Sequence, residues 1–159
     1  MLKKSLALCL LLCAITHSYA AGDPIVLTVG AAIKTTSRMN IAADRSRVDI
    51  IAEGAGALTA QGRTVRFYAL CSVVDTLTGT RQIDGAGDCE LKSTAGGVAY
   101  LHFRSDAGHG DRGQVSVDGG TGDFAGIDGK VAVEVSVNPG KVGKPVFFIE
   151  GRTDPAMQQ

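Results

Sequence analysis

The side chains of this chain that could do chemistry stand at alternate positions in three short, apolar-rich stretches. Those that share one phase of the alternation are Arg66, Tyr68, Tyr100, His102, Arg104 and Glu150. If this phase lines a cavity, Tyr68, His102 and Glu150 could converge as acid, base and orienting groups around an apolar ligand. We therefore name Tyr68, Tyr100, His102 and Glu150 as candidate ligand-binding residues. The alternative is an outward polar face with subunit contacts, and no catalytic residue is assigned.

The sequence lacks the usual patterns of covalent and metal catalysis. A serine hydrolase would need a G-x-S-x-G elbow, which does not occur. His102 and His109 are the only histidines after residue 20, and three convergent metal ligands are not apparent around His109-Gly110-Asp111. We expect no metal and no cofactor, and the residues favour a non-enzymatic role without deciding the question.

Five glycines fall within the eleven positions from Gly119 to Gly129, between two runs of alternating valines. A dinucleotide-binding fingerprint is excluded, because Ala125 stands where its third glycine belongs and a strand pattern follows. A P-loop is excluded as well, since Val131 occupies its Ser/Thr position. Glycine suits tight corners, so the segment predicts a shaped connection between two strands. Its structural residues are Gly119, Gly120, Thr121, Gly122, Phe124, Gly126 and Gly129.

The first 20 residues have the order of a secretory signal peptide. Lys3 and Lys4 precede an apolar run over residues 6–15, and Ser18-Tyr19-Ala20 forms a small-x-small cleavage site. The run is shorter than the about 20 residues that span a membrane. The sequence therefore predicts cleavage after Ala20, a secreted or periplasmic protein without a membrane span, and a single domain over residues 21–159.

The composition after cleavage excludes some partners and suggests one covalent bond. Loss of Lys3 and Lys4 from the 16 basic residues leaves 14 against 16 acidic ones, a net charge of −2. With no tryptophan and no basic patch, we expect no binding to nucleic acid. Cys71 and Cys89 remain, and an even pair in an oxidising compartment favours a disulfide worth about 3 kcal/mol. A redox pair or a zinc site is the alternative, but the spacing is far from C-x-x-C and no second ligand pair exists.

The elements that must position these residues are short strands separated by glycine-bearing turns. Residues 25–33 alternate with the two-residue period of a strand. Further strands are predicted at about 47–52, 57–59, 64–74, 87–93, 98–104, 114–117, 130–137 and 145–152, with turns at 54–56, 61–62 and 76–80. Residues 40–53 also fit a helical stripe, but a loop followed by a strand is favoured. This rhythm predicts an all-β barrel or sandwich.

The two faces of these strands differ less than usual. Val65, Phe67, Ala69, Cys71 and Val73 form one apolar face of their strand. The opposite phase is mixed rather than polar, since it also holds Tyr68, Leu70, Val74, Val98, Tyr100, Val146 and Phe148. A solvated antiparallel face would be more uniformly polar. Either an oligomer covers these side chains, or one face lines an apolar cavity.

The segment Gly119-Gly120-Thr121-Gly122-x-Phe124-x-Gly126-Ile127-x-Gly129 resembles the signature of the allene oxide cyclase and dirigent-like β-barrel superfamily. The likeness extends more loosely to Gly54-x-Gly56 through Cys71, and to Gly85-x-Gly87-x-Cys89. It implies a calycin-like, closed antiparallel barrel of about eight strands, with Phe124 and Ile127 as a plug at one end. Bacterial members of this group are small secreted proteins of unassigned activity. Plant members include a cyclase and proteins that direct radical coupling, and none of their functional residues can be carried over to this chain.

Three functions are consistent with these observations. The first is a binder of a small hydrophobic ligand, or an interaction module; the second is a cyclase-like isomerase; the third is a structural homo-oligomer. A lumen of roughly 300 Å³ or more with convergent polar groups would favour the first two. A lumen filled by Phe, Leu and Val side chains would exclude both of these pocket-based functions.

Overall fold

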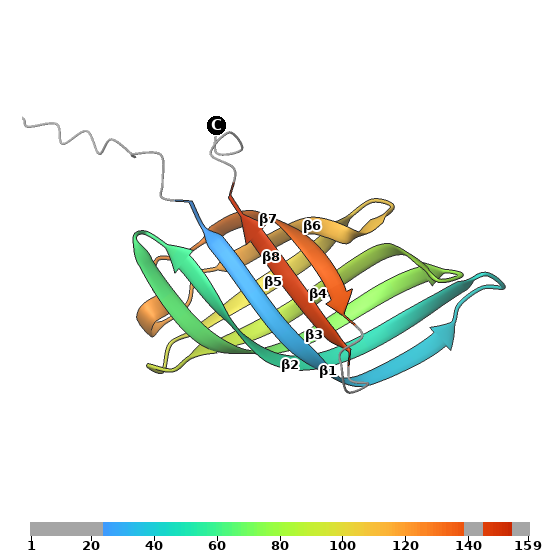
Figure 1. The fold of residues 1–159 in the computed structure, drawn as a ribbon, viewed down its shortest axis with the longest axis horizontal. Coiled ribbons are helices and arrows are strands. Elements are labelled where there is room, and N and C mark those ends of the chain that lie inside the picture. Colours follow the sequence, from blue (N-terminus) through green and yellow to red (C-terminus); the bar gives the residue numbers. More distant parts are fainter. Residues whose placement is uncertain (1–23, 139–144, 154–159) are drawn as a thin grey trace, which may run out of the picture.

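The computed structural model describes residues 24–138 and 145–153, which form a closed barrel of antiparallel strands (Figure 1). Each strand pairs with its neighbours in the chain, and the first strand pairs with the last. The predicted all-β barrel is therefore confirmed, and the sandwich is not the fold adopted. The predicted signal peptide, residues 1–20, lies outside the described residues.

Eight strands make up the barrel: β1 (Val26–Asn40), β2 (Arg45–Ala60), β3 (Arg63–Thr78), β4 (Arg81–Ser93), β5 (Val98–Asp106), β6 (His109–Asp118), β7 (Gly129–Asn138) and β8 (Val146–Arg152). A 3₁₀ turn, η1 (Gly122–Phe124), separates β6 from β7. Within the described ranges no helix is long and apolar enough to cross a membrane. Where β1 meets β8, the Ile25 N–H donates to Thr153 Oγ1 at 2.7 Å and the Thr153 N–H donates to the Ile25 carbonyl at 2.9 Å.

The strict alternation of side chains decides which residues fill the lumen. In β3, Val65, Phe67 and Cys71 are buried, whereas Tyr68 and Leu70 are 67% and 49% exposed. From Val65 to Val73 the apolar phase of β3 thus points inward, and its mixed phase forms the outer wall. The mixed faces do not line a cavity inside the barrel.

Strand β2 is longer than the sequence predicted. The expected turn at residues 54–56 does not form, and β2 pairs with β1 and β3 without a break through this region. At Gly54, a Cβ atom would collide with the Gly30 carbonyl oxygen and the Ala31 backbone of β1. The glycine therefore permits a close approach of two strands in the barrel wall, which is the other common use of glycine within a strand.

One end of the barrel is plugged by the glycine-rich segment between β6 and β7, and we call it the closed end. Phe124 of η1 is completely buried, and Ile127 is 1% exposed. The centroid of the Phe124 ring lies 6.2 Å from the ring centroid of Phe67, a lumen residue of β3. The segment thus supplies apolar side chains that fill this end of the lumen.

At the opposite end, which we call the open end, the hairpins β1–β2, β3–β4 and β5–β6 make their turns (Figure 1). Both β3 and β4 reach further toward this end than expected, because β3 continues to Thr78 and β4 begins at Arg81. The turn predicted at residues 76–80 shrinks to Gly79 and Thr80. Asp75, which the sequence placed just beyond a strand, is therefore an inward-facing strand residue, because it continues the lumen phase of Cys71 and Val73.

Candidate functional site

The four candidate ligand-binding residues lie on the outer wall of the barrel. Tyr68 is on β3, Tyr100 and His102 are on β5, and Glu150 is on β8; all four are exposed. Glu150 is flanked by Thr28 and Glu134 on its neighbouring strands, and β6 and β7 separate it from His102. The structure does not bring Tyr68, His102 and Glu150 together. Whether any of the four binds a ligand stays a prediction.

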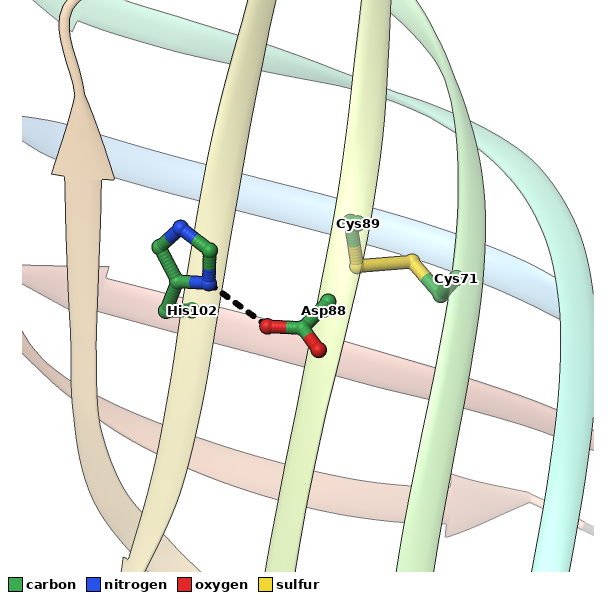
Figure 2. The surroundings of a disulfide bond; sticks show 4 residues. All are labelled: Cys71, Asp88, Cys89 and His102. Atoms are coloured by element: carbon green, nitrogen blue, oxygen red, sulfur yellow. Dashed lines mark hydrogen bonds and ion pairs between the residues drawn. A yellow bond between two sulfur atoms is a disulfide. The ribbon is translucent and has the colours of Figure 1, made fainter.

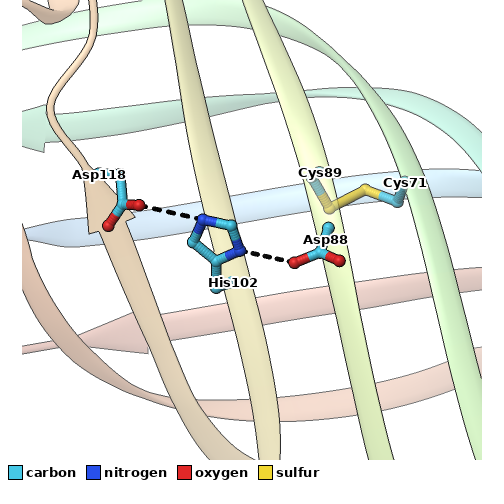
Figure 3. A network of polar contacts seen from close by, with 5 residues as sticks. All are labelled: Cys71, Asp88, Cys89, His102 and Asp118. Carbon is cyan, nitrogen blue, oxygen red and sulfur yellow. Dashed lines mark hydrogen bonds and ion pairs between the residues drawn. A yellow bond between two sulfur atoms is a disulfide. The ribbon is translucent and has the colours of Figure 1, made fainter.

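His102 takes part in a polar network that the sequence did not reveal (Figure 3). Its Nδ1 lies 2.6 Å from Asp88 Oδ1 on β4, and its Nε2 lies 3.0 Å from Asp118 Oδ2 at the end of β6. The hydrogen bond to Asp88, together with the charge of Asp118, raises the pKa of the imidazole. Since both ring nitrogens face carboxylates, the network suits the doubly protonated imidazolium. The network links strands β4, β5 and β6 on the outer surface of the barrel.

Cys71 and Cys89 form the predicted pair, with an S–S distance of 2.08 Å (Figure 2). They stand directly opposite each other on β3 and β4, and both side chains point into the lumen. Asp88 precedes Cys89, so it points to the other side of the same strand, toward His102 (Figure 2). The bridge therefore joins two strands inside the barrel, and the polar network lies on the outer face of one of them.

The lumen is filled over much of its length and leaves a small pocket near the open end. Five fully buried side chains pack between the closed end and the middle: Leu27, Leu58, Leu91, Leu101 and Val115. The pocket has a volume of about 60 Å³. Most of its lining is apolar: Ile33, Ile50, Val73, Phe103, Val135 and Phe147, with Cys89 at its inner side. The volume is far below the roughly 300 Å³ of a typical small-molecule pocket, so a large enclosed lumen is not found in the described part of the chain.

Asp75 and Gln82 are the polar side chains among the residues that line this pocket. The Gln82 Nε2 donates a hydrogen bond to Asp75 Oδ1 at 2.7 Å. Burial raises the pKa of Asp75 from its usual 3.8 to about 6, against the opposing effect of the Gln82 hydrogen bond and with a smaller contribution from Asp84. Near neutral pH this carboxyl can therefore exchange a proton within an otherwise apolar pocket.

A shift in strand register places Gln82 beside Asp75. The pairing of β3 with β4 slips between Thr76 and Leu77, so that Leu77 faces Gln82 while Asp75 still faces Gly85. In a regular strand Gln82 and Gly85 would point to opposite faces, because they are three residues apart. The extra residue of the bulge brings both to the lumen side. Two further register shifts, at Ile33/Thr35 and at Ser105/Asp106, also lie toward the open end.

Two glycines leave the space that the Asp75–Gln82 pair occupies. A Cβ atom at Gly85 would stand 2.7 Å from Asp75 Oδ1 and 2.8 Å from Gln82 Nε2. At Gly110 on β6, a Cβ atom would collide with the Gln82 side chain from Cβ to Cδ. Glycines on β4 and β6 thus leave room for the side chains of Asp75 and Gln82.

The sequence contained a partial signal for this site. Asp75 continues the inward phase of Val65, Phe67, Ala69, Cys71 and Val73, and a carboxylate in that phase is unusual. Gln82 carried no such signal, because its inward orientation depends on the bulge. Within the described ranges, no group of three or more His, Cys, Asp or Glu side chains is arranged to hold a metal ion.

Comparison with known proteins assigns neither a family nor a function to this chain. No family model matches the chain. No curated protein matches it either. Among solved structures, the chain is similar to a pyocyanin demethylase, with a TM-score of 0.40 and 15% sequence identity over 80% of this chain and 99% of that one. No functional residue is transferred from that protein to this chain.

Proposed function

We propose that the barrel binds a small molecule at its open end, with an apolar group of the ligand in the pocket and a polar group hydrogen-bonded to Asp75 or Gln82. The observation that supports this is a carboxyl of raised pKa in a pocket whose lining is apolar apart from Asp75 and Gln82. Placing a carboxyl in apolar surroundings costs folding free energy. Such groups gather at binding and catalytic sites, where their interaction with a ligand offsets that cost.

The volume of the pocket limits how the ligand sits. About 60 Å³ accommodates one end of a molecule but not the whole of a drug-sized one. The rest of the ligand would lie against the inner faces of the long hairpins β1–β2 and β3–β4, which continue beyond the pocket. The proposed site is thus partly open to solvent. It differs from the enclosed lumen of roughly 300 Å³ that the sequence analysis set as the condition for a ligand pocket.

A second function, a cyclase-like isomerase, is favoured by the same carboxyl. A general acid or base works best when its pKa lies near the working pH, and Asp75 has a pKa of about 6. In such a reaction Asp75 would take a proton from the bound molecule and return it at another atom, with Gln82 holding the carboxyl in position.

We also propose kinship with the allene oxide cyclase and dirigent-like barrels and a location outside the cytoplasm. The eight-stranded closed barrel and the glycine-rich segment that plugs it support the kinship. The Cys71–Cys89 pair and the N-terminal sequence pattern support the location. Exposed Tyr68, Leu70 and Phe148 on the outer wall are the observation that supports the remaining alternative, a homo-oligomer.

Binding can be tested with the neutral fluorescent probe 1-N-phenylnaphthylamine and two neighbouring substitutions. Val73→Phe places extra volume in the pocket, and Val74→Phe adds the same volume on the outer wall. We expect the first variant to weaken probe binding at least tenfold and the second to leave it unchanged, with circular dichroism confirming that both fold. Equal binding by the two variants, or no binding by the wild type, would contradict the proposal.

The isomerase can be separated from the binder through the molecules that copurify from the native host. Asp75→Asn keeps an oxygen that accepts the Gln82 hydrogen bond and removes the exchangeable proton. An isomerase predicts that wild type and variant carry different isomers of one mass, which chromatography followed by mass spectrometry resolves. Identical isomers in both proteins would rule out conversion at Asp75.

A further inference from the structure

Among the described residues, the wall of the barrel extends beyond the pocket at the β1–β2 and β3–β4 hairpins. Strand β1 pairs with β8 as far as Ala32 but continues to pair with β2 up to Asn40. Strands β2 and β3 also pair throughout this region, from Arg45 opposite Thr78 onward. The β1–β2 and β3–β4 hairpins therefore project past the pocket at the open end (Figure 1).

Arg38 is located on the inner face of this projection, in the same transverse row as Asp75. Arg38 pairs with Val48, and Val48 pairs with Asp75, so the three side chains share one face of the sheet. Two strand spacings separate Arg38 from Asp75, roughly 10 Å between their backbones. The neighbouring row toward the barrel contains Ile50 and Val73, which line the pocket. Thr36 is the β1 member of that row and is polar, so the apolar path from the pocket toward the Arg38 guanidinium runs over Ile50 and Val48 of β2.

The charge of Arg38 is not neutralised by the described part of the chain. Its Nε donates to Ser46 Oγ at 3.0 Å, and one Nη donates to the Gly79 carbonyl at 3.5 Å. Both acceptors are neutral, and among the described residues no carboxylate lies within ion-pairing distance of this side chain. A guanidinium has five N–H groups, so three remain. These suffice for the bidentate contact that arginine makes with a carboxylate.

We propose that the open end binds an organic carboxylate with an apolar body, whose apolar end enters the pocket and whose carboxylate pairs with Arg38. This inference rests on the proposed ligand site and adds the chemical class of the ligand. Ser46 contributes by fixing the Arg38 side chain, because its buried hydroxyl accepts the hydrogen bond of the Arg38 Nε.

The test uses decanoate and decanol as competitors of 1-N-phenylnaphthylamine. Wild-type protein is expected to bind decanoate more tightly than decanol. In Arg38→Gln, decanoate affinity should fall about tenfold or more, the usual effect of losing a charge-assisted hydrogen bond, while decanol and the probe are unaffected. Arg38→Lys keeps the charge and should retain part of the decanoate affinity. Arg47→Gln, an outward-facing arginine on the same hairpin that pairs with Asp49, is the matched control and should behave as wild type.

The possible results separate this inference from the function on which it rests. If the probe binds and Val73→Phe abolishes its binding, but Arg38→Gln leaves decanoate affinity unchanged, the ligand site stands and the carboxylate assignment is overturned. If Arg38→Gln weakens the probe, decanol and decanoate equally, Arg38 has a structural role only, and the assignment is overturned as well. If no probe binds in the wild type, the ligand site itself is wrong.

Discussion

The two ends of the barrel are built on different principles. At the closed end Phe124 and Ile127 are buried, and the Phe124 ring lies 6.2 Å from that of Phe67. At the open end the strand register slips in three hairpins, and the pocket holds a carboxyl and an amide. The closed end resembles an ordinary protein core. The open end departs from regular strand pairing and from apolar filling, as functional sites commonly do.

This contrast suggests that stability and function are divided along the axis of the barrel. Substitutions at the closed end should change the free energy of unfolding and leave ligand binding intact. Substitutions at the open end should change ligand binding, or the pH dependence of stability, at a smaller cost in folding than those at the closed end. Each expectation below tests one side of this division.

The largest effect is expected from Phe124→Ala. Truncating a fully buried aromatic side chain typically costs about 3–5 kcal/mol, and here it would also unplug the lumen. Urea denaturation followed by circular dichroism measures the loss. At urea concentrations where the variant remains folded, its affinity for the probe should equal that of wild type. A loss below about 1 kcal/mol would mean that the closed end is not the stabilising half.

Removal of the cysteine bridge should have the next largest effect. The two cysteines are 18 residues apart in the chain, and closing a loop of this size is worth about 3 kcal/mol in the chain-entropy model. We expect Cys71→Ala/Cys89→Ala and wild type under reducing conditions to lose similar amounts of stability. In protein without residues 1–20, which contain Cys9 and Cys13, titration of thiols in the unreduced, unfolded state should detect none, and two titratable thiols would contradict the bridge.

Asp75→Asn should make the protein more stable at pH 8. Asp75 has a pKa of about 6 in the folded protein and 3.8 as its usual value, so the folded state holds the proton more tightly. Wild-type stability therefore falls as the pH rises from about 4 through 6, and the penalty is complete above that range. Because solvent screens part of this carboxyl, we expect on the order of 1–2 kcal/mol. A stability difference between wild type and variant that does not change from pH 4 to pH 8 would contradict this.

Gly110→Ala should weaken the open-end site and also cost about 1–3 kcal/mol in stability, because the new Cβ would clash with the Gln82 Cβ, which side-chain rotation cannot move. The new Cβ would collide with Gln82 and turn its amide away from Asp75. Loss of that hydrogen bond should raise the pKa of Asp75 further, because the bond favours the ionised form. The pKa can be followed by NMR of the carboxyl carbon. Gly119→Ala is the control, since its nearest neighbour to a new Cβ is 3.6 Å away.

The smallest effect is expected from His102→Gln on the outer wall. The pairs of His102 with Asp88 and Asp118 are exposed, and such pairs contribute about 0.2–1 kcal/mol. The folded-state pKa of His102 is raised, so its contribution is complete below the unfolded pKa and is lost as the pH rises through the folded value. The variant should thus be slightly less stable at pH 5 and equal to wild type at pH 9. No change in probe binding is expected.

The sequence predicted the barrel well because strand faces can be read from simple alternation. Val65, Phe67 and Cys71 alternate with polar and exposed residues, and this alternation alone indicates that the cysteine pair faces the core. The turn predicted at residues 54–56 was wrong, because glycine is common both in turns and where two strands approach closely, as Gly54 does here. Only the position of Gly30 and Ala31 on the neighbouring strand distinguishes the two.

The candidate site was predicted less well, for reasons that lie in long-range pairing. His102 was singled out by its residue type, but its partners Asp88 and Asp118 come from two other strands. Asp75 was in the inward phase, yet the sequence ended its strand one residue earlier. Gln82 faces inward because β4 contains one extra residue opposite β3. Bulges have no dependable sequence signature, so the pairing of Asp75 with Gln82 could be seen only in the structure.

The pairing of β1 with β8 has a consequence for how the chain is made. Strand β1, the first of the barrel to be synthesised, needs β8, the last, as a partner. The hydrogen bonds between Ile25 and Thr153 beside this pairing join residues 128 positions apart. Until β8 has been synthesised, β1 can pair with β2 in a hairpin, but the other edge of β1 has no partner strand. Such an edge is a template for pairing with another copy of the chain. The nascent barrel is thus most prone to misassociate just before its final strand arrives.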